Sequence, residues 1–223
     1  KTAMEGALGM SYMGKRALVC MKHVGMNVAA DPFVNSAMTG VNGGLVVVAA
    51  DDPSMHSSQN EQDSRFYGKF AMMPIFEPSS QQEAYEMTRA AFELSEAVKL
   101  PVLMRVTTRM AHSRAVVEIT ENPRKQNEIN RPEDVRTWIL LPAFAKKRYV
   151  KLLEQQDDLM KAAVESKYNW YVKGTNPERG VICTGIAYNY YMENAADCKE
   201  RSVLKVSQYP LPVALIEQMV ADG

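Results

Sequence analysis

Short apolar runs alternate with amphipathic stretches along the first half of the chain, a pattern that is typical of α/β domains. The runs at 17–21, 45–50 and 102–106 are predicted to be buried strands, because they are short and rich in branched aliphatic residues. The first two are apolar throughout, and the third contains one arginine. Strands that are separated by helices favour a mainly parallel sheet with helices packed on its faces. The pattern therefore predicts an α/β fold.

The helices that separate these strands have recognisable ends. One at 2–13 stops at a glycine, and one at 31–40 begins with an Asp–Pro pair. A third begins after Ser80, where Glu83 completes a capping box.

The alternation of apolar strands and helices stops in the middle of the chain and resumes near its end. Residues 115–141 are polar and rich in turn formers, so they are predicted to form a connector. Residues 142–173 are predicted to form a long amphipathic, charged helix, either continuous or broken. A second α/β unit follows, with strands at 181–184 and 203–206 and helices at 187–196 and 213–220. Because this unit is too small to bury a core of its own, we expect it to pack on the first one or to be incomplete.

Composition narrows the possible classes of protein. The 223 residues carry 26 basic and 26 acidic side chains, so the basic excess of a nucleic-acid or membrane-surface protein is absent. No apolar stretch approaches the roughly 20 residues of a membrane helix. Cys20, Cys183 and Cys198 are widely spaced, which predicts reduced thiols in the cytoplasm rather than disulfides, a zinc site or an iron–sulfur cluster. The chain starts within a helical pattern and stops just after another, so it is expected to be a piece of a longer polypeptide.

Polar side chains gather directly after the three predicted strands of the first half. His23, His56 and His112 each follow one strand, and the second strand opens into DDPSMHSSQNEQDSRF. Ligands of open parallel sheets bind beyond the carboxyl ends of the strands, so this edge is the candidate site. Gly25 is expected to permit close approach of the backbone to a ligand. The same edge collects Lys22, Asn27, Asp51, Asp52, Gln59, Asn60, Asp63, Thr107, Thr108, Arg109, Ser113 and Arg114.

Each of these residues also has a purely structural interpretation. The histidines can brace loops, and the Asp51–Asp52–Pro53 stretch can form a turn and a helix cap. Arg109 and Arg114 can pair with Asp51, Asp52 or Glu118. The sequence contains no GxGxxG, GxxxxGK[ST], GxSxG or HExxH motif, so the residues alone predict a ligand-binding or catalytic α/β domain without naming its reaction.

Two long stretches resemble one family of enzymes. They are KHVGMNVAADPFVNSAMTGVNGGLVVVAADDPSMHSSQNEQDSRFYGKFAMMPIFEPSS and LPVLMRVTTRMAHSR, and the likeness continues more loosely through GVICTGIAYNYYMENA and SVLKVSQYPLP. The family is that of the alpha subunits of indolepyruvate:ferredoxin oxidoreductases, which depend on thiamine diphosphate. The resemblance implies a pyrimidine-binding domain of the thiamine-diphosphate-binding fold at 1–116, truncated at its N-terminus. A connector with a long helix would occupy 117–178, and a transketolase-C-terminal-like domain would begin at 179–223.

The resemblance also implies an activity and its partners. The complete enzyme would decarboxylate aryl pyruvates oxidatively to aryl-acetyl-CoA, using coenzyme A and passing electrons to ferredoxin. A beta subunit and an oligomeric assembly are implied. Thiamine diphosphate with Mg²⁺ would be shared with a domain outside this chain, and iron–sulfur clusters would lie only in the missing C-terminal part. The isolated chain is expected to be inactive; the alternative is a non-catalytic α/β binding or assembly module that keeps the fold.

The same resemblance implies roles for particular residues. His23 and His56 are the catalytic candidates, since neutral imidazole and amide donors stabilise negative charge during decarboxylation. The glutamate that exchanges a proton with the thiamine ring in this family would stand ahead of Lys1, and Glu5 is not assigned to that role. No residue is assigned to a metal. The implied cofactor contacts are Lys22, His23, Val24, Gly25 and Asn27, and the implied substrate contacts are His56, Ser57, Ser58, Gln59, Asn60 and Arg109.

Overall fold

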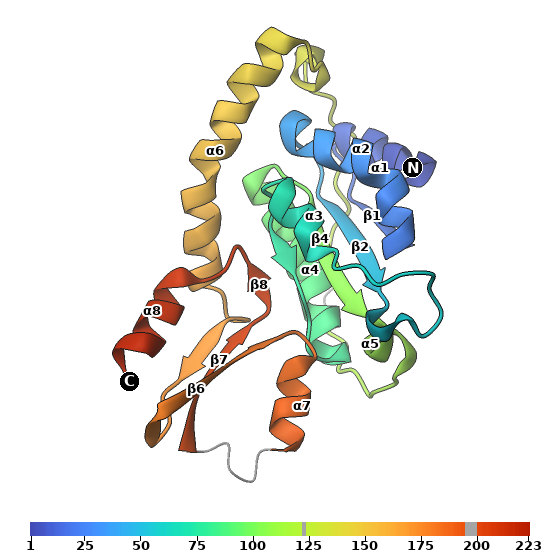
Figure 1. The fold of residues 1–223 in the computed structure, drawn as a ribbon. Helices are drawn as coiled ribbons and strands as arrows, with labels where there is room; N and C mark the ends of the chain where they lie inside the picture. The colour runs from blue at the N-terminus through green and yellow to red at the C-terminus, as the bar shows by residue number, and fades with distance from the viewer. Residues whose placement is uncertain (122–123, 195–199) are drawn as a thin grey trace.

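The apolar runs form strands of two sheets, and the long helix α6 precedes all strands of the second sheet in the sequence (Figure 1). The computed structural model describes residues 1–121, 124–194 and 200–223. The first sheet contains β1 (Ala17–Lys22), β2 (Leu45–Asp51), β3 (Ile75–Phe76), β4 (Val102–Thr107) and β8 (Gln208–Tyr209), and the second contains β5 (Trp170–Val172), β6 (Asn176–Thr184) and β7 (Arg201–Val206). The helices are α1 (Thr2–Tyr12), α2 (His23–Thr39), α3 (Arg65–Phe70), α4 (Gln81–Val98), α5 (Thr108–His112), α6 (Pro142–Val164), α7 (Ala187–Glu193) and α8 (Val213–Ala221), with short 3-10 helices η1 (Pro53–Met55) and η2 (Val135–Trp138).

The first sheet has the strand order β1–β2–β4–β3–β8. Its first four strands are parallel to one another, and β8 pairs antiparallel with β3. Lys22 at the end of β1 lies beside Ala50, and Asp51 at the end of β2 lies beside Thr107 at the end of β4. The carboxyl ends of these three strands therefore lie level at one edge. The predicted α/β fold with a mainly parallel sheet is confirmed.

Strand β2 separates two layers of core. Leu45 and Val47 join a buried cluster with side chains of α1, α2 and α6, whereas Val46 joins a second cluster with Met87 of α4. All four side chains have an exposed fraction of 0%. A strand that is covered on both faces has no polar face, and this is why β2 reads in the sequence as a continuous apolar run.

Helix α2 begins at His23, so the predicted start at residue 31 is wrong. Pro32 lies inside the helix and removes one main-chain hydrogen bond. The buried Met26, Ala29 and Phe33 form a stripe along one face of the helix, and their burial compensates for that loss.

Helix α6 ends at Val164 rather than at residue 173, and the residues beyond it include strand β5. The buried Asn169 redirects the chain: its Oδ1 accepts hydrogen bonds from the main-chain N–H groups of Ser207 at 2.7 Å and Gln208 at 2.9 Å. Its Nδ2 donates to the carbonyl of Ala163 at 2.9 Å. The contacts with Ser207 and Gln208 join distant parts of the chain, so the helical pattern at 142–173 does not reveal them.

The second unit packs on the first, as its small size predicted. Strands β6 and β7 are parallel, and β8 leaves this unit to pair antiparallel with β3 of the first sheet. Leu204, Val206 and Met219 belong to the same buried cluster as Leu45. The helix predicted at 187–196 is seen as α7, and the end of that prediction and Cys198 fall outside the described residues. None of the helices in the described residues has the length and apolarity that crossing a bilayer requires.

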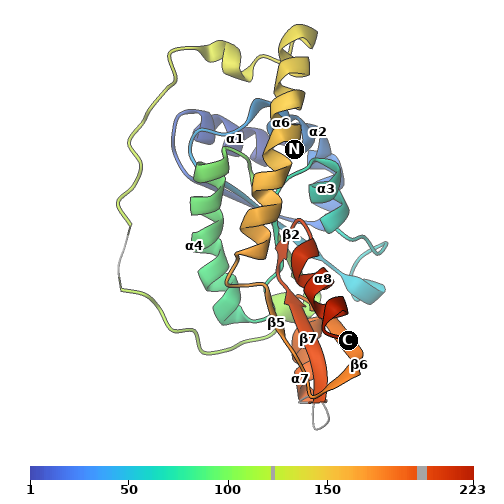
Figure 2. The ribbon, with the colours of Figure 1, turned by 90° about the vertical axis from the view of Figure 1, so that its left-hand side faces the viewer.

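The connector runs along the outside of α4 (Figure 2). Its Asn127 donates from Nδ2 to Glu96 of α4 at 2.7 Å. Arg16 donates to both oxygens of the same carboxylate, from Nε at 2.9 Å and from Nη2 at 2.6 Å. The hydrogen bonds from Arg16 are the main reason why the pKa of Glu96 falls to about 2. Glu96 thus joins the start of β1, the end of α4 and the connector.

We expect the stability that Glu96 contributes to depend on pH. Its pKa in the folded state, about 2, lies below its ordinary value of 4.5, so the contribution is complete above about pH 4.5 and is lost as the pH falls towards 2. Urea denaturation should therefore show a lower midpoint for Glu96→Gln than for the unsubstituted protein at pH 7, and a smaller difference at pH 3. Glu154→Gln, on the exposed face of α6, is the control. An equal difference at both pH values contradicts this account.

Candidate functional site

The polar residues that follow β1, β2 and β4 meet at the edge where these strands end, as the sequence predicted. Thr108, the first residue after β4, donates from its hydroxyl to the carboxylate of Asp52 at 2.6 Å and to the carbonyl of Asp51 at 3.2 Å. We call residues 52–64 the polar loop. It starts at β2, passes over the beginning of α2 and ends at α3.

Asp52 shapes the start of the polar loop. It is buried, and its carboxylate accepts hydrogen bonds from the main-chain N–H groups of His56 at 3.2 Å and Ser57 at 2.8 Å. The Thr108 hydroxyl first, and then the Ser57 N–H, hold the pKa of Asp52 below its usual range. The structural interpretation of Asp52 as a turn-capping residue is confirmed. Its partners are a hydroxyl and amides, so the pairing with Arg109 or Arg114 is wrong for this residue.

The backbone of the loop turns sharply within this cap. Ser54 and Met55 have φ values of 66° and 54°, in the left-handed region that residues other than glycine rarely adopt. The Ser54 N–H donates to the carboxylate of Glu61 at 3.0 Å, and the Met55 N–H donates to the Asp52 carbonyl at 3.0 Å. The acidic side chains of the loop hold a conformation that the backbone alone would not favour.

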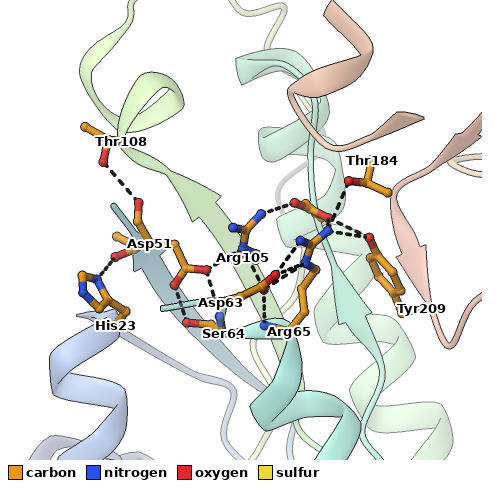
Figure 3. Close-up of polar contacts among 11 residues, drawn as sticks. His23, Asp51, Asp63, Ser64, Arg65, Arg105, Thr108, Thr184 and Tyr209 are labelled. Carbon is orange, nitrogen blue, oxygen red and sulfur yellow. Dashed lines mark hydrogen bonds and ion pairs between the residues drawn. The ribbon is translucent and has the colours of Figure 1, made fainter. Parts of the chain in front are cut away.

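Asp51 is buried and joins the loop to the sheet (Figure 3). Its carboxylate accepts hydrogen bonds from Arg105 Nε at 2.5 Å, from the Ser64 N–H at 2.9 Å and from the Ser64 hydroxyl. Arg105 also donates from Nη1 to Glu77. Asp51 therefore pairs with Arg105 of β4 and not with Arg109 or Arg114. The signal for this partner was present in the sequence, because an arginine inside the apolar run VLMRV needs a buried carboxylate.

His23 lies beneath the polar loop and is fully buried. Its Nε2 is 3.1 Å from the carbonyl oxygen of Asn60, and its Nδ1 is 3.4 Å from that of Ala50. Lys22 reaches the same loop from its exposed position, with Nζ 3.4 Å from the carbonyl oxygen of Ser57. Gly25 makes room for Met21, because a Cβ at that position would come within 3.0 Å of the Met21 Cβ. The glycine thus serves close packing at the end of β1.

The other predicted contacts are more accessible. His56, Ser57, Gln59 and Asn60 are exposed on the loop, while Ser58 and Val24 are half-buried. Asn27 is exposed and accepts a hydrogen bond from the Tyr67 hydroxyl. His112 is exposed at the end of α5.

Arg109 is the exposed cation of this edge that lies nearest in sequence to the Thr108–Asp52 contact. In the part of the chain that the structure describes, its guanidinium makes no ion pair. A guanidinium without a carboxylate partner is suited to bind a small molecule that carries a carboxylate. The predicted site residues thus divide into a buried supporting set and an exposed set that can contact a ligand.

Two further features of the described residues concern the predicted site: possible metal ligands and an apolar hollow. Within 1–121, 124–194 and 200–223, no three His, Cys, Asp or Glu side chains are arranged to bind a metal ion. A largely apolar hollow of about 500 Å³ lies beside Arg65, Thr184 and Tyr209, away from the predicted ligand contacts.

Sequence comparison relates the chain to known proteins. The family described as pyruvate flavodoxin/ferredoxin oxidoreductase, thiamine diphosphate-binding, matches residues 1–150. The chain is 44% identical over 225 residues to the indolepyruvate oxidoreductase subunit IorA of Archaeoglobus fulgidus, covering 100% of this chain and 36% of that protein. It is 42% identical over 224 residues to the subunit of the same name from Methanothermobacter thermautotrophicus, covering 99% and 36%. The chain thus spans little more than a third of the length of these curated relatives.

A solved structure has the same fold. It is a 2-oxoglutarate:ferredoxin oxidoreductase from Magnetococcus marinus with 2-oxoglutarate, coenzyme A and succinyl-CoA bound, and its TM-score is 0.71 at 15% sequence identity. The match covers 98% of this chain and 46% of that one. The relatives confirm the resemblance seen in the sequence. Because the family match extends over more than half of its residues, the chain belongs to the pyruvate flavodoxin/ferredoxin oxidoreductase family, in the region described as thiamine diphosphate-binding.

Proposed function

We propose that the chain is part of the alpha subunit of an indolepyruvate:ferredoxin oxidoreductase. The complete enzyme would convert an aryl pyruvate and coenzyme A into aryl-acetyl-CoA and carbon dioxide, and would pass two electrons to ferredoxin. The names of the relatives support this reaction. The observation that carries the proposal for this site is the exposed Arg109, which makes no ion pair with the described residues and directly follows Thr108, the residue that binds Asp52 at the start of the polar loop.

Within this proposal, thiamine diphosphate would bind with its pyrimidine end against the start of α2. The surface there fits a flat, polar ring: Lys22 and Asn27 offer exposed donors and Val24 a half-buried apolar contact. His23 would support this surface from beneath, since its side chain is buried. Bound thiamine diphosphate supplies the nucleophilic carbon and the electron sink for decarboxylation. The diphosphate and Mg²⁺ would be held by a domain outside this chain.

The exposed residues receive distinct roles. Arg109 would bind the substrate carboxylate through two parallel hydrogen bonds. His56, Gln59 and Asn60 would donate to the keto oxygen, where negative charge develops. His23 would keep the loop in place through the Asn60 carbonyl. Gly25 would contribute by allowing β1 and α2 to pack closely.

The remaining parts of the proposal concern the complete protein. Residues 1–116 would be the pyrimidine-binding domain, 117–178 the connector and 179–223 the start of a transketolase-C-terminal-like domain. A beta subunit and ferredoxin would be the protein partners within an oligomeric, cytoplasmic enzyme. Iron–sulfur clusters would be carried outside this chain.

The proposal predicts activity for the complete complex and none for this chain alone. Purified alpha and beta subunits should reduce ferredoxin only when aryl pyruvate, coenzyme A and thiamine diphosphate are all present. Spectrophotometry of ferredoxin measures this directly, and pyruvate and 2-oxoglutarate serve as comparison substrates. A complex that binds the cofactor but reduces no ferredoxin would favour the non-catalytic module instead.

We expect Arg109→Met to weaken substrate binding. Loss of a charge-assisted hydrogen-bond pair should raise the KM for aryl pyruvate by roughly 10- to 100-fold, with a smaller effect on kcat. Steady-state kinetics of the complete complex gives both constants. Arg131→Met, on the exposed connector, is the matched control and should leave them unchanged. An unaltered KM in the Arg109 variant removes this residue from the substrate site.

The two histidines should behave differently. His56→Ala should lower kcat by about 100-fold without changing the melting temperature, because the side chain is an exposed donor. His23→Ala should lower stability by about 1–3 kcal/mol, because it removes a fully buried side chain and the hydrogen bond that its ring N–H donates to a main-chain carbonyl. Kinetics and thermal denaturation of the two variants separate these effects. Normal turnover in the His56 variant rules out its part in the chemistry.

A further inference from the structure

Arg65 directly follows the polar loop and is held locally by the loop itself. Its main-chain N–H and its Nε donate to Asp63 Oδ1 at 3.0 and 2.9 Å, and its Nη2 donates to Oδ2 at 2.5 Å. The same local arrangement occurs in the connector, where Arg136 donates to Asp134 Oδ1 from its N–H at 3.0 Å and its Nε at 2.9 Å. The clamp between Asp63 and Arg65 is therefore a short-range motif.

The remaining guanidinium nitrogen of Arg65, Nη1, points out of the loop towards three side chains from other parts of the chain (Figure 3). Nη1 lies 3.2 Å from Glu77 Oε2, 3.2 Å from the Thr184 hydroxyl and 3.3 Å from the Tyr209 hydroxyl. Tyr209 in turn donates to Glu77 at 2.8 Å. Thr184 ends β6 and Tyr209 lies in β8, so Arg65 joins the end of the polar loop to the second unit.

The backbone of the second unit is shaped for this contact. Gly185 follows Thr184 with a φ of +49°, and a Cβ there would come within 2.6 Å of the Glu77 side chain. The Glu77 N–H also donates to the Ser207 carbonyl at 2.7 Å. Only a glycine lets the turn after β6 lie so close to the carboxylate that Arg65 shares with Tyr209.

We propose that Arg65 is a positioning residue, which fixes the end of the polar loop against the second unit. The start of the loop is held within the first unit by Asp52 and Thr108. His23 and Asp51 of the first unit also hold the loop, at Asn60 and Ser64. The placement of the exposed Gln59 and Asn60 therefore depends on these contacts and on the docking of the second unit through Arg65. The importance of this placement for turnover rests on the proposed function, whereas the coupling of the loop to the second unit does not.

Three substitutions separate this role from a general effect on stability. Arg65→Lys keeps the positive charge but loses the planar fork that reaches Asp63 and the second unit together. Tyr209→Phe removes one hydroxyl from the second unit and leaves Arg65 intact. Arg136→Lys is the matched control, because it alters the same kind of local clamp at a place where no hydrogen bond or ion pair to the described residues of the second unit is seen.

Hydrogen–deuterium exchange of the complete complex tests the coupling. In Arg65→Lys, the amides of 53–62 and of 207–209 should exchange about 10-fold faster, which corresponds to the loss of a hydrogen bond to a charged group. Tyr209→Phe should change the same two segments in the same direction by a smaller factor. Arg136→Lys should match the unsubstituted complex, and amides of β2 and α4 should be unchanged in all three variants.

The outcomes that overturn the proposal are distinct from those that overturn the proposed function. Unchanged exchange at 53–62 in both Arg65→Lys and Tyr209→Phe overturns it, as does faster exchange spread evenly over the chain. If Arg65→Lys does not fold, Tyr209→Phe decides the question alone. Kinetics of the same samples should show a fall in kcat/KM that follows the exchange rate of the loop. If the unsubstituted complex has no aryl-pyruvate activity, the proposed function fails, and the exchange data still decide the role of Arg65.

Discussion

The buried ion pair between Asp51 and Arg105 is the constraint on which the rest of the structure depends. Side-chain exposure is 0% for this aspartate and 9% for the arginine, so both charges have left water. Such a pair is stable only when the remaining donors and acceptors are also satisfied. Ser64 completes the shell of Asp51 and Glu77 takes the other side of Arg105. The loop, β2, β4 and the end of β3 are therefore held in one arrangement.

This network has one more carboxylate than guanidinium, and hydroxyl donors stabilise the additional negative charge. Three carboxylates, those of Asp51, Asp63 and Glu77, meet two guanidiniums. The hydroxyls of Ser64 and Tyr209 donate to the first and the last of these carboxylates. Burial, and then the neighbouring Glu77, raise the pKa of Tyr209 above its usual range, so this hydroxyl keeps its proton and remains a donor. The acids at the ends of the polar loop thus serve the fold, while the exposed imidazole, amide and guanidinium groups are left for a ligand.

The sequence predicted those parts of the fold that depend on local pattern. Strands β1, β2 and β4 were found because each is a short, mainly apolar run. The start of α4 was found because Ser80 and Glu83 fit a capping box, and Ser80 does accept a hydrogen bond from the N–H of Glu83 at 3.2 Å. The start of α2 and the end of α6 were misplaced, since a buried stripe overrides Pro32 and distant main-chain groups bind Asn169. The candidate edge was predicted from topology. The burial of His23 was not, because the loop that covers it lies beyond the next strand.

The second unit also explains why the polar loop cannot be understood from the first unit alone. A unit of this size buries too little apolar surface to be stable by itself. It is fixed instead by β8, which pairs with β3, and by side chains that complete the first core. The same strand carries Tyr209 to Glu77 and Arg65. Strand β8 forms the edge of the first sheet, and its Tyr209 hydroxyl joins the ion network. The same few contacts therefore set the packing of the second unit and the geometry of the loop.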